Sequence, residues 1–298
     1  MPIMKNSAFI IAGPTASGKS DFAHVLAQKT GGVIINCDSV QVYRGIENIA
    51  ASPFAGRDIA DMINGVPYRL FSVLDLSAQI SVAEYLAMAR REYIAARDAG
   101  RVAIFVGGTG YYIHAILNGI SPIPDVSPAV RCRAREMVAA DIAAARAMLP
   151  ADFGFSDPQR IARALEVFLQ TGHHLVEYQR APRSGAIDMC AKTIIINPPA
   201  DVLRARIAAR IPDMINGGAL AEAENIIKNS IGENRAIGAE QLCRYLRGEI
   251  SYDECCENWI NKTNQYAKRQ RTWFRTQIAP DVVISHVPDA DDIDMVLD

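Results

Sequence analysis

The chain has 298 residues, 50% of them hydrophobic, and a formal net charge of −2, which suits one large α/β domain or a core with a smaller domain. Its apolar runs are too short to span a bilayer, and its start lacks the apolar segment and cleavage site of a signal peptide. From these two absences we expect a soluble, cytoplasmic protein with no membrane partner. The six cysteines show no C-x-x-C spacing, which argues against a zinc site.

Strand and helix patterns alternate in the N-terminal part of the chain. Residues 8–13, AFIIAG, form a short apolar run that ends at glycine, as in a buried parallel strand, and a helix is expected over about residues 19–29. A second strand is expected within residues 31–39, a helix with a capping box over 81–100, and another buried strand within 101–110. This alternation predicts a parallel sheet with helices on both faces.

The pattern changes in the middle of the chain. No strand pattern occurs over residues 127–179, where one helix is expected to begin at Pro128 and another to run from Pro158 to Gly172. We therefore predict an all-helical insertion over residues 123–186.

The strand pattern then returns. A strand is expected within residues 191–199, followed by a helix after Pro199, a long helix capped by Ser251, and a last strand within 281–287. The predicted fold is an α/β, P-loop NTPase-like parallel sheet with helices on both faces, built from residues 1–122 and 187–298.

Residues 13–20, GPTASGKS, match the phosphate-binding pattern G-x-x-x-x-G-K-[ST] between a strand and a helix. Backbone N–H groups of such a loop hold phosphate oxygens at a helix N-terminus. Lys19 adds a positive charge and Ser20 offers a hydroxyl ligand to Mg²⁺, the expected cofactor. The predicted phosphate-binding residues are Gly13, Pro14, Thr15, Ala16, Ser17, Gly18, Lys19 and Ser20. The loop alone leaves open whether the phosphate belongs to ATP.

Asp38 follows the second predicted strand, at the edge of the sheet where ligands of α/β folds gather. Two interpretations stay open on spacing alone. The carboxylate can bind Mg²⁺ through water or accept a proton from a nucleophile, or it can bond its own backbone in an Asx turn.

Five motifs occur in order along almost the whole chain: GPTASGKS, DSVQVYRG, VGGTGYYI, RALEVFLQTG and YAKRQRTWFR. Together they resemble the bacterial tRNA isopentenyltransferase family, also called tRNA dimethylallyltransferases. The resemblance implies transfer of a dimethylallyl group from dimethylallyl diphosphate to N6 of the adenosine immediately 3′ of the anticodon, position 37, with release of diphosphate. It assigns catalysis to Lys19, Asp38 and Thr109, and a diphosphate contact to Arg210.

The resemblance also implies a tRNA anticodon stem-loop as partner, bound by a monomer. The implied tRNA contacts are Asp38, Ser39, Val40, Gln41, Thr109, Arg131, Gln159, Arg160, Ile161, Ala162, Arg163, Lys268, Arg271 and Arg275. The last three fall at i, i+3 and i+7 of one helix, a spacing suited to phosphate contacts that position RNA. Trp273 and Phe274 either stack on a base or pack in the core.

The sequence departs from the family pattern at residues 46–53, 67–70 and 237–241, and at Pro212, where a helix-compatible residue is expected. These departures concern RNA and donor contacts. Three other functions are alternatives: a prenyltransferase acting on free AMP, a P-loop kinase of a small molecule, and a non-catalytic tRNA-binding protein. The helical insertion and the basic YAKRQRTWFR segment favour a tRNA substrate over free AMP. Nothing in the sequence resembles the acceptor pocket and lid arginine of a kinase, and intact Lys19 and Asp38 argue against the third.

Overall fold

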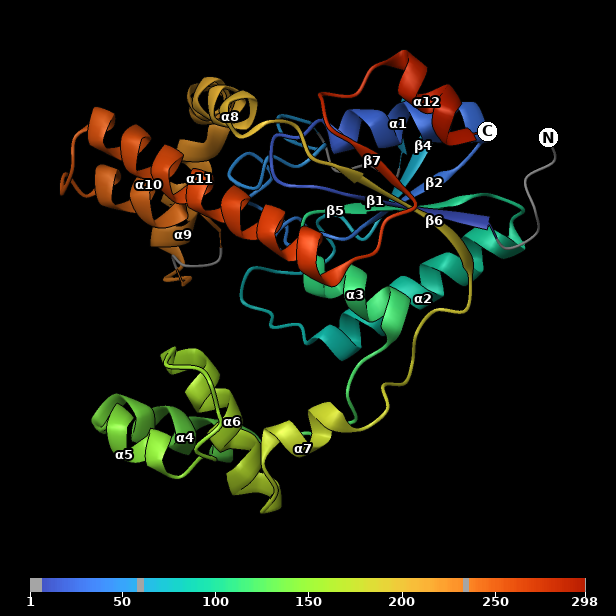
Figure 1. Ribbon diagram of the computed structural model, residues 1–298. Helices are drawn as coiled ribbons and strands as arrows, with labels where there is room; N and C mark the ends of the chain where they lie inside the picture. Colours follow the sequence, from blue (N-terminus) through green and yellow to red (C-terminus); the bar gives the residue numbers. More distant parts are fainter. Residues whose placement is uncertain (1–6, 58–61, 233–235, 298) are drawn as a thin grey trace. The chain divides into compact units, whose positions relative to one another are not determined.

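The computed structural model describes residues 7–57, 62–232 and 236–297 (Figure 1). They divide into two compact units. The first unit is Met1–Leu117 with Ile187–Asp298, and the second is Asn118–Ala186. The second unit contains the whole segment 123–186 for which an all-helical insertion was predicted.

In the described residues of the first unit, seven strands form one sheet. In spatial order they are β3 (Met62–Ile63), β4 (Val66–Arg69), β2 (Val33–Asn36), β5 (Ala103–Gly107), β1 (Ser7–Ala12), β6 (Cys190–Ile196) and β7 (Val282–Ile284). Every neighbouring pair is parallel except β3 and β4. Ala12 lies opposite both Gly107 and Ile195, so the carboxyl ends of β1, β5 and β6 meet at one edge of the sheet.

The helices of the first unit are α1 (Lys19–Thr30), α2 (Val82–Asp98), α3 (Gly110–Asn118), α8 (Ala200–Met214), the π-helical turn η1 (Ile215–Ala219), α9 (Leu220–Lys228), α10 (Ala239–Leu246), α11 (Tyr252–Gln277) and α12 (Ala290–Leu297). Figure 1 shows α1 and α12 on one face of the sheet and α2 and α3 on the other. The predicted fold class, a P-loop-like parallel sheet with helices on both faces, is confirmed.

Two apolar clusters hold the first unit together. One joins the sheet to α1 and α12 through residues such as Ile11, Leu26 and Ile293. The other joins the segment after β2 to α8–α11, with Ile46 and Trp259 among its buried members. The second cluster fixes the helical layer beside the carboxyl edge of the sheet.

Local signals placed most helix ends correctly. The capping box at the start of α2 is present, because the Ser81 hydroxyl accepts from the Glu84 amide and the Glu84 carboxylate accepts from the Ser81 amide. The same exchange between Ser251 and Glu254 starts α11. The short strands β3 and β4 were not predicted.

Pro212 lies inside α8, two residues before the helix gives way to η1. Because proline lacks the N–H that the helical ladder needs, a helix interruption close to it is expected. Gly218 has a φ of 127° in η1, and a Cβ on Gly217 or Gly218 would come within 3.2 Å of the Asn48 side chain. The interruption therefore lets the α8–α9 junction approach the segment after β2 closely.

The second unit consists of α4 (Pro128–Ala140), α5 (Ile142–Ala147), α6 (Pro158–Thr171) and α7 (Leu175–Arg180) in its described residues, with no strand. Its core contains Ala134, Ile161 and Leu165. The predicted caps are present, since Asp157 accepts from the Arg160 amide and Gly172 ends α6 with φ 75°.

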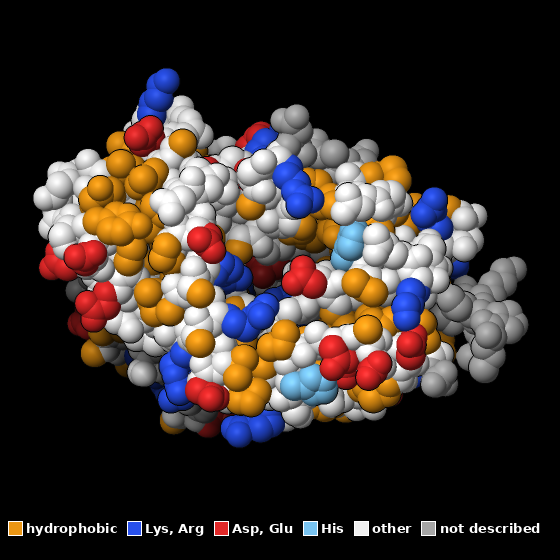
Figure 2. Space-filling view, turned by 90° about the horizontal axis from the view of Figure 1, so that it is seen from above, with side chains coloured by type: hydrophobic (Ala, Val, Ile, Leu, Met, Phe, Trp, Pro, Cys, Tyr) orange, Lys and Arg blue, Asp and Glu red, His pale blue; other side chains and the backbone are white. Residues whose placement is uncertain are grey.

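The charged side chains are dispersed. On the face shown in Figure 2, Lys and Arg side chains are scattered among Asp and Glu, in line with the net charge of −2. No helix among the described residues is long and apolar enough to cross a membrane.

Candidate active site

The phosphate-binding loop, residues 13–20, leaves β1 and enters α1 at Gly18, which has a φ of 91° and is the N-cap. A Cβ on Gly13 would lie 2.4 Å from the Ile196 carbonyl, so only glycine lets the loop start so close to β6. No side chain caps α1, which leaves its N-terminus open to an anion.

Three cationic side chains surround this loop. Lys19 Nζ donates to the Pro14 carbonyl at 3.2 Å, Arg210 Nη2 to Thr15 Oγ1 at 2.8 Å, and Arg206 Nε to the Ala16 carbonyl at 2.8 Å. All three acceptors are neutral. The positive charges are therefore not neutralised by these contacts, as expected of a site for a phosphorylated ligand.

Burial affects two of these cations. It lowers the pKa of Lys19 to about 8, with Asp38 opposing the shift and Arg210 adding to it. Burial also lowers the pKa of Arg210, and Arg206 adds to that effect. The Arg210 Nε atom is buried and has no hydrogen-bond partner in the described part of the chain. A bound anion would stabilise both cations.

Asp38 is held by its own backbone and by Asn36. Its Oδ1 accepts from the Val40 amide at 2.9 Å, which is the Asx turn anticipated from the sequence. The buried Asn36 side chain accepts from the Asp38 amide at 2.8 Å and donates to the Asp38 and Leu70 carbonyls at 3.0 Å. Asp38 Oδ2 accepts no hydrogen bond from residues 7–57, 62–232 or 236–297, so one oxygen fixes the turn and the other remains available.

Thr109 lies beside this turn. Its Oγ1 accepts from the Ser39 amide at 2.9 Å and donates to Ser39 Oγ at 3.1 Å. The approach depends on Gly107, where a Cβ would lie 2.2 Å from the Cys37 carbonyl. The structure thus brings together the predicted catalytic residues Asp38 and Thr109, from the ends of β2 and β5.

One cavity of about 660 Å³ is lined by residues 15–20 of the phosphate-binding loop, by Asp38 and by Ser39, the residue that Thr109 contacts. Its polar wall contains the phosphate-binding loop, Asp38, Ser39, Gln41, Arg206 and Arg210. Its apolar wall contains Ile49, Ala50, Ala51, Ile211, Met214, Ala236, Ile237 and Trp259. A ligand with an anionic end and a small apolar end matches this division.

The departure at residues 46–53 forms part of the apolar wall. The Glu222 carboxylate accepts from the Asn48 amide, the Asn48 side chain and the Ile49 amide at 2.7–2.8 Å. The Gln41 side-chain amide donates to the carbonyls of Ala50 and Ala51 at 3.1 Å. Sequence reasoning missed Glu222, because no motif links α9 to this segment.

Helix α11 contributes two further residues that the sequence analysis did not assign. Gln270 is buried, accepts from the Thr15 amide and donates to the Gly108 carbonyl, both at 2.8 Å, and so links the phosphate-binding loop to the loop after β5. Tyr266 lines the cavity, and its pKa is raised by burial and by the nearby Asp38, while hydrogen bonding with Thr109 opposes the rise. Their only sequence signal was their position in the YAKRQRTWFR motif, of which Tyr266 is the first residue.

The predicted basic face of α11 divides into two kinds of residue. Lys268 and Arg275 are exposed, whereas Arg271 is half-buried and donates Nε to Asn197 Oδ1 at 2.8 Å. Phe274 is only 2% exposed, so the idea that it stacks on a base is wrong and its role is in the core. Trp273 is half-buried against Gly110, where a Cβ would lie 2.1 Å from its ring.

The predicted RNA contacts of the second unit also divide. Gln159 and Arg160 are exposed at the start of α6, Arg163 pairs with Glu166 at 3.0 Å, and Arg131 is half-buried. Ile161 and Ala162 are 1% and 7% exposed and pack in the helical core, so their side chains cannot contact RNA. The correction follows from helical periodicity, which turns these two positions inward.

Residues 41–277 match the IPP transferase family, and residues 6–62 match the isopentenyl transferase family. The chain belongs to the IPP transferase family. This membership confirms the resemblance drawn from the five motifs and makes the chain a transferase.

Individual members of the IPP transferase family are similar along most of their length. The tRNA dimethylallyltransferase of Rhodospirillum rubrum is 40% identical over 294 residues, which cover 93% of this chain and 87% of that protein. The tRNA dimethylallyltransferase of Azorhizobium caulinodans is 40% identical over 291 residues, covering 92% and 91%. The crystal structure of the tRNA isopentenylpyrophosphate transferase of Bacillus halodurans superposes with a TM-score of 0.69 at 28% identity, covering 98% of this chain and 94% of that one.

Proposed function

We propose that this chain transfers a dimethylallyl group from dimethylallyl diphosphate to N6 of the adenosine immediately 3′ of the anticodon in tRNA, position 37, and releases diphosphate. The observation that carries the proposal is one cavity, in a member of the IPP transferase family, that is lined by the cationic phosphate loop and by Asp38 as well as by apolar side chains. The names of its close relatives support tRNA as the acceptor.

The cationic loop holds and stabilises the leaving group. As the bond between the donor's C1 carbon and its oxygen breaks, the electron pair leaves with the diphosphate. Lys19, Arg210 and the amides at the start of α1 stabilise this charge, and they are already in place before the reaction. The apolar wall around Ile237 and Trp259 holds the dimethylallyl group and keeps water away from C1.

Asp38 assists the acceptor. The N6 lone pair of the adenine forms the new bond to C1, and the proton that N6 loses passes to Asp38 Oδ2. The Asx turn and Asn36 fix the conformation of Asp38, which lines the cavity. Thr109 holds the same turn through Ser39, and Tyr266 lines the cavity, where it helps to orient the adenine, which must leave its stack to enter.

A magnesium ion fits the donor set of this site. The Ser20 hydroxyl is exposed at the start of α1, and Asp21 and Asp38 line the same cavity, so the available ligands are the hard oxygens that Mg²⁺ prefers. We propose that Ser20 binds the ion directly. When bound, Mg²⁺ adds positive charge at the diphosphate oxygens.

The tRNA contacts proposed from exposed positions are Lys268 and Arg275 on α11 and Gln159 and Arg160 on α6. We propose that the enzyme acts as a monomer, with the second unit contacting the anticodon stem-loop.

One assay tests the function against its rivals. Radiolabelled dimethylallyl diphosphate is offered with unmodified tRNA, with AMP and with buffer alone, in the presence of Mg²⁺. We expect label in tRNA only. Label in AMP at an equal rate would contradict the tRNA assignment, and phosphate transfer from ATP to a small molecule would replace it by a kinase activity.

A further inference from the structure

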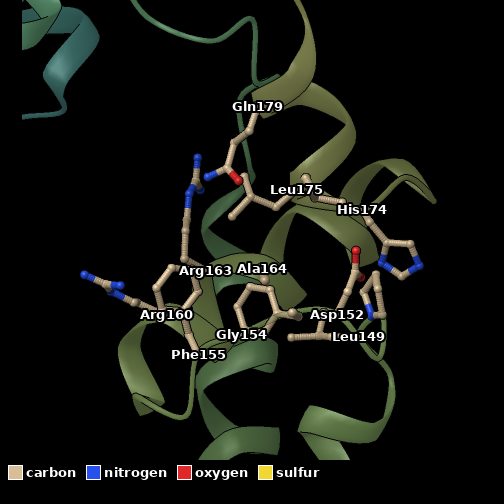
Figure 3. Close-up of a pocket in the computed structure, with 13 residues that line it drawn as sticks. Leu149, Asp152, Gly154, Phe155, Arg160, Arg163, Ala164, His174, Leu175 and Gln179 are labelled. Carbon is tan, nitrogen blue, oxygen red and sulfur yellow. The ribbon is translucent and has the colours of Figure 1, made fainter. Parts of the chain in front are cut away.

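The second unit holds a pocket of its own, remote in sequence from the phosphate-binding loop. The pocket has a volume of about 310 Å³ and lies between α6, α7 and the segment that joins α5 to α6 (Figure 3). This volume is at the lower end of the range for small-ligand sites. We propose that the pocket binds one unstacked nucleobase of the RNA substrate, with Phe155 and Arg160 as its stacking platform.

The platform is flat and accessible. The Arg160 guanidinium lies 4.3 Å above the centre of the Phe155 ring, and Phe153 meets Phe155 edge-on at 5.5 Å. Phe155 is 46% exposed, which is unusual for a phenylalanine in a small helical unit. Aromatic rings and arginine guanidinium planes are the two groups on which proteins stack unpaired bases.

The remaining walls fit a planar group with a polar edge. Ala164 and Leu175 supply apolar sides, while Gln179 and Asp152 stand at opposite ends of the pocket (Figure 3). An amide offers both donors and acceptors, and a carboxylate accepts from exocyclic amines, so each can pair with a polar group on a different edge of one base.

Charge favours a nucleotide over an apolar ligand. Arg160 lines the pocket, is exposed and lies over an uncharged ring, so a phosphate attached to the bound base meets its positive charge, whereas Arg163 already pairs with Glu166. An apolar peptide or a lipid chain gains nothing from the Arg160 guanidinium. The prenyl donor has its own cationic loop in the first unit.

The inference rests on the proposed function, because it names a nucleotide of the same RNA substrate. A base-paired stem cannot present a free base to such a pocket, so the ligand is a loop nucleotide. The pocket therefore acts as a second anchor, which holds one loop base while another base enters the catalytic cavity.

The test uses the full chain and a fluorescent 17-nucleotide anticodon stem-loop RNA, with a series in which each loop nucleotide in turn is abasic. Phe155→Leu keeps an apolar side chain and removes the aromatic ring, whereas Phe155→Tyr keeps the ring. Tyr252→Leu is the matched control, since Tyr252 is a 39% exposed aromatic residue of the first unit. Arg160→Leu supplies a second, surface variant.

We expect Phe155→Leu to weaken RNA affinity about tenfold, as stacking on one base is worth about 1–3 kcal/mol. Phe155→Tyr and Tyr252→Leu should bind like the wild type, and donor affinity should not change. For one position in the loop, the abasic RNA should bind the wild type about tenfold more weakly than the intact RNA does. Phe155→Leu should bind the intact and the abasic RNA with equal affinity, and so should Arg160→Leu.

Unchanged affinity of Phe155→Leu, or abasic losses that add fully to it at every position, would overturn the pocket assignment. Those results leave the proposed function intact if the wild type still prenylates tRNA. Absence of transfer to tRNA by the wild type would instead overturn the proposed function.

Discussion

At the scale of single residues, the structure shows that the Asx turn, one of the two interpretations left open for Asp38, does not exclude the other. Its Oδ1 closes the Asx turn on Val40, its Oδ2 accepts no hydrogen bond within the part of the chain that the structure describes, and the residue lines the cavity. The turn therefore orients the Asp38 carboxylate, the proposed general base. Asparagine retains the turn-forming oxygen and removes the basicity, which makes it a sharper substitution than alanine.

Asp38→Asn should lower kcat by about 10²-fold or more, the size of a general-base effect, with donor affinity unchanged. Steady-state prenyl transfer to tRNA and direct binding of dimethylallyl diphosphate measure the two quantities. Asp213→Asn, a second acid of the same cavity, is the control and should keep wild-type kcat. Near wild-type kcat in Asp38→Asn would remove Asp38 from the proton transfer.

The buried ammonium group of Lys19 should lower the stability of the ligand-free protein. Its pKa of about 8 in the folded protein lies below the ordinary value of 10.5, so folding disfavours the ammonium. This cost is complete below pH 8 and fades as the pH rises toward 10.5, because the unfolded chain then also loses the proton.

Lys19→Met should therefore raise Tm at pH 7 and raise it less at pH 9.5, while abolishing prenyl transfer. Thermal unfolding of the ligand-free protein at both pH values measures this. Lys268→Met, at an exposed position of α11, is the control and should leave Tm unchanged. Equal Tm values for wild type and Lys19→Met at pH 7 would contradict the burial of the charge.

Several residues of the site were beyond sequence reasoning. Gln270 reaches Thr15 across 255 positions, and Glu222 reaches Asn48 across 174. Their amide and carboxylate groups have no local signature, because their role comes from the folded path of the chain. The loop around Lys19 was predictable, since its sequence pattern lies within eight consecutive residues.

At the scale of elements, the helices and buried strands were predictable where the signal is local. Capping at Ser81 and Ser251 and the helix stop at Gly172 depend on neighbours within four positions. β4 was missed because it has four residues, contains Pro67, and exists only through pairing with β2 and β3. Pairing of that kind is not encoded in a local pattern.

The turn into α10 gives an element-scale prediction. Gly238 has a φ of 105°, and a Cβ there would lie 2.1 Å from the Trp259 ring. Gly238→Ala should cost about 2 kcal/mol or more, from overpacking and backbone strain together. Denaturant unfolding measures the loss. Gly248→Ala also has a positive φ but no atom within 4 Å, so it should cost clearly less. Equal losses would mean that backbone strain alone decides.

At the scale of the whole molecule, a net charge of −2 must coexist with binding to a polyanion. Local charge resolves this, because the interval from residue 259 to residue 278 contains five basic residues and no acid. The structure reduces the set that is free to meet RNA. Arg271 is bound to Asn197 and Lys262 pairs with Glu240 at 2.7 Å, which leaves Lys268, Arg269 and Arg275 exposed, of which Lys268 and Arg275 belong to the predicted basic face.

The double variant Lys268→Gln, Arg275→Gln should therefore weaken tRNA binding and flatten its salt dependence. Each phosphate contact that is lost removes about 0.7–0.9 from the slope of log K against log salt, so two contacts remove about 1.4–1.8. The measurement is tRNA affinity at several salt concentrations for wild type and variant. Arg101→Gln with Lys228→Gln removes two exposed charges elsewhere and should leave the slope unchanged. Arg271→Gln alone should lower the stability of the protein and change the slope little, since its guanidinium holds α11 to the residue after β6. A slope that is the same in the double variant and the wild type would mean that this face of α11 is only solvated and that RNA binds elsewhere.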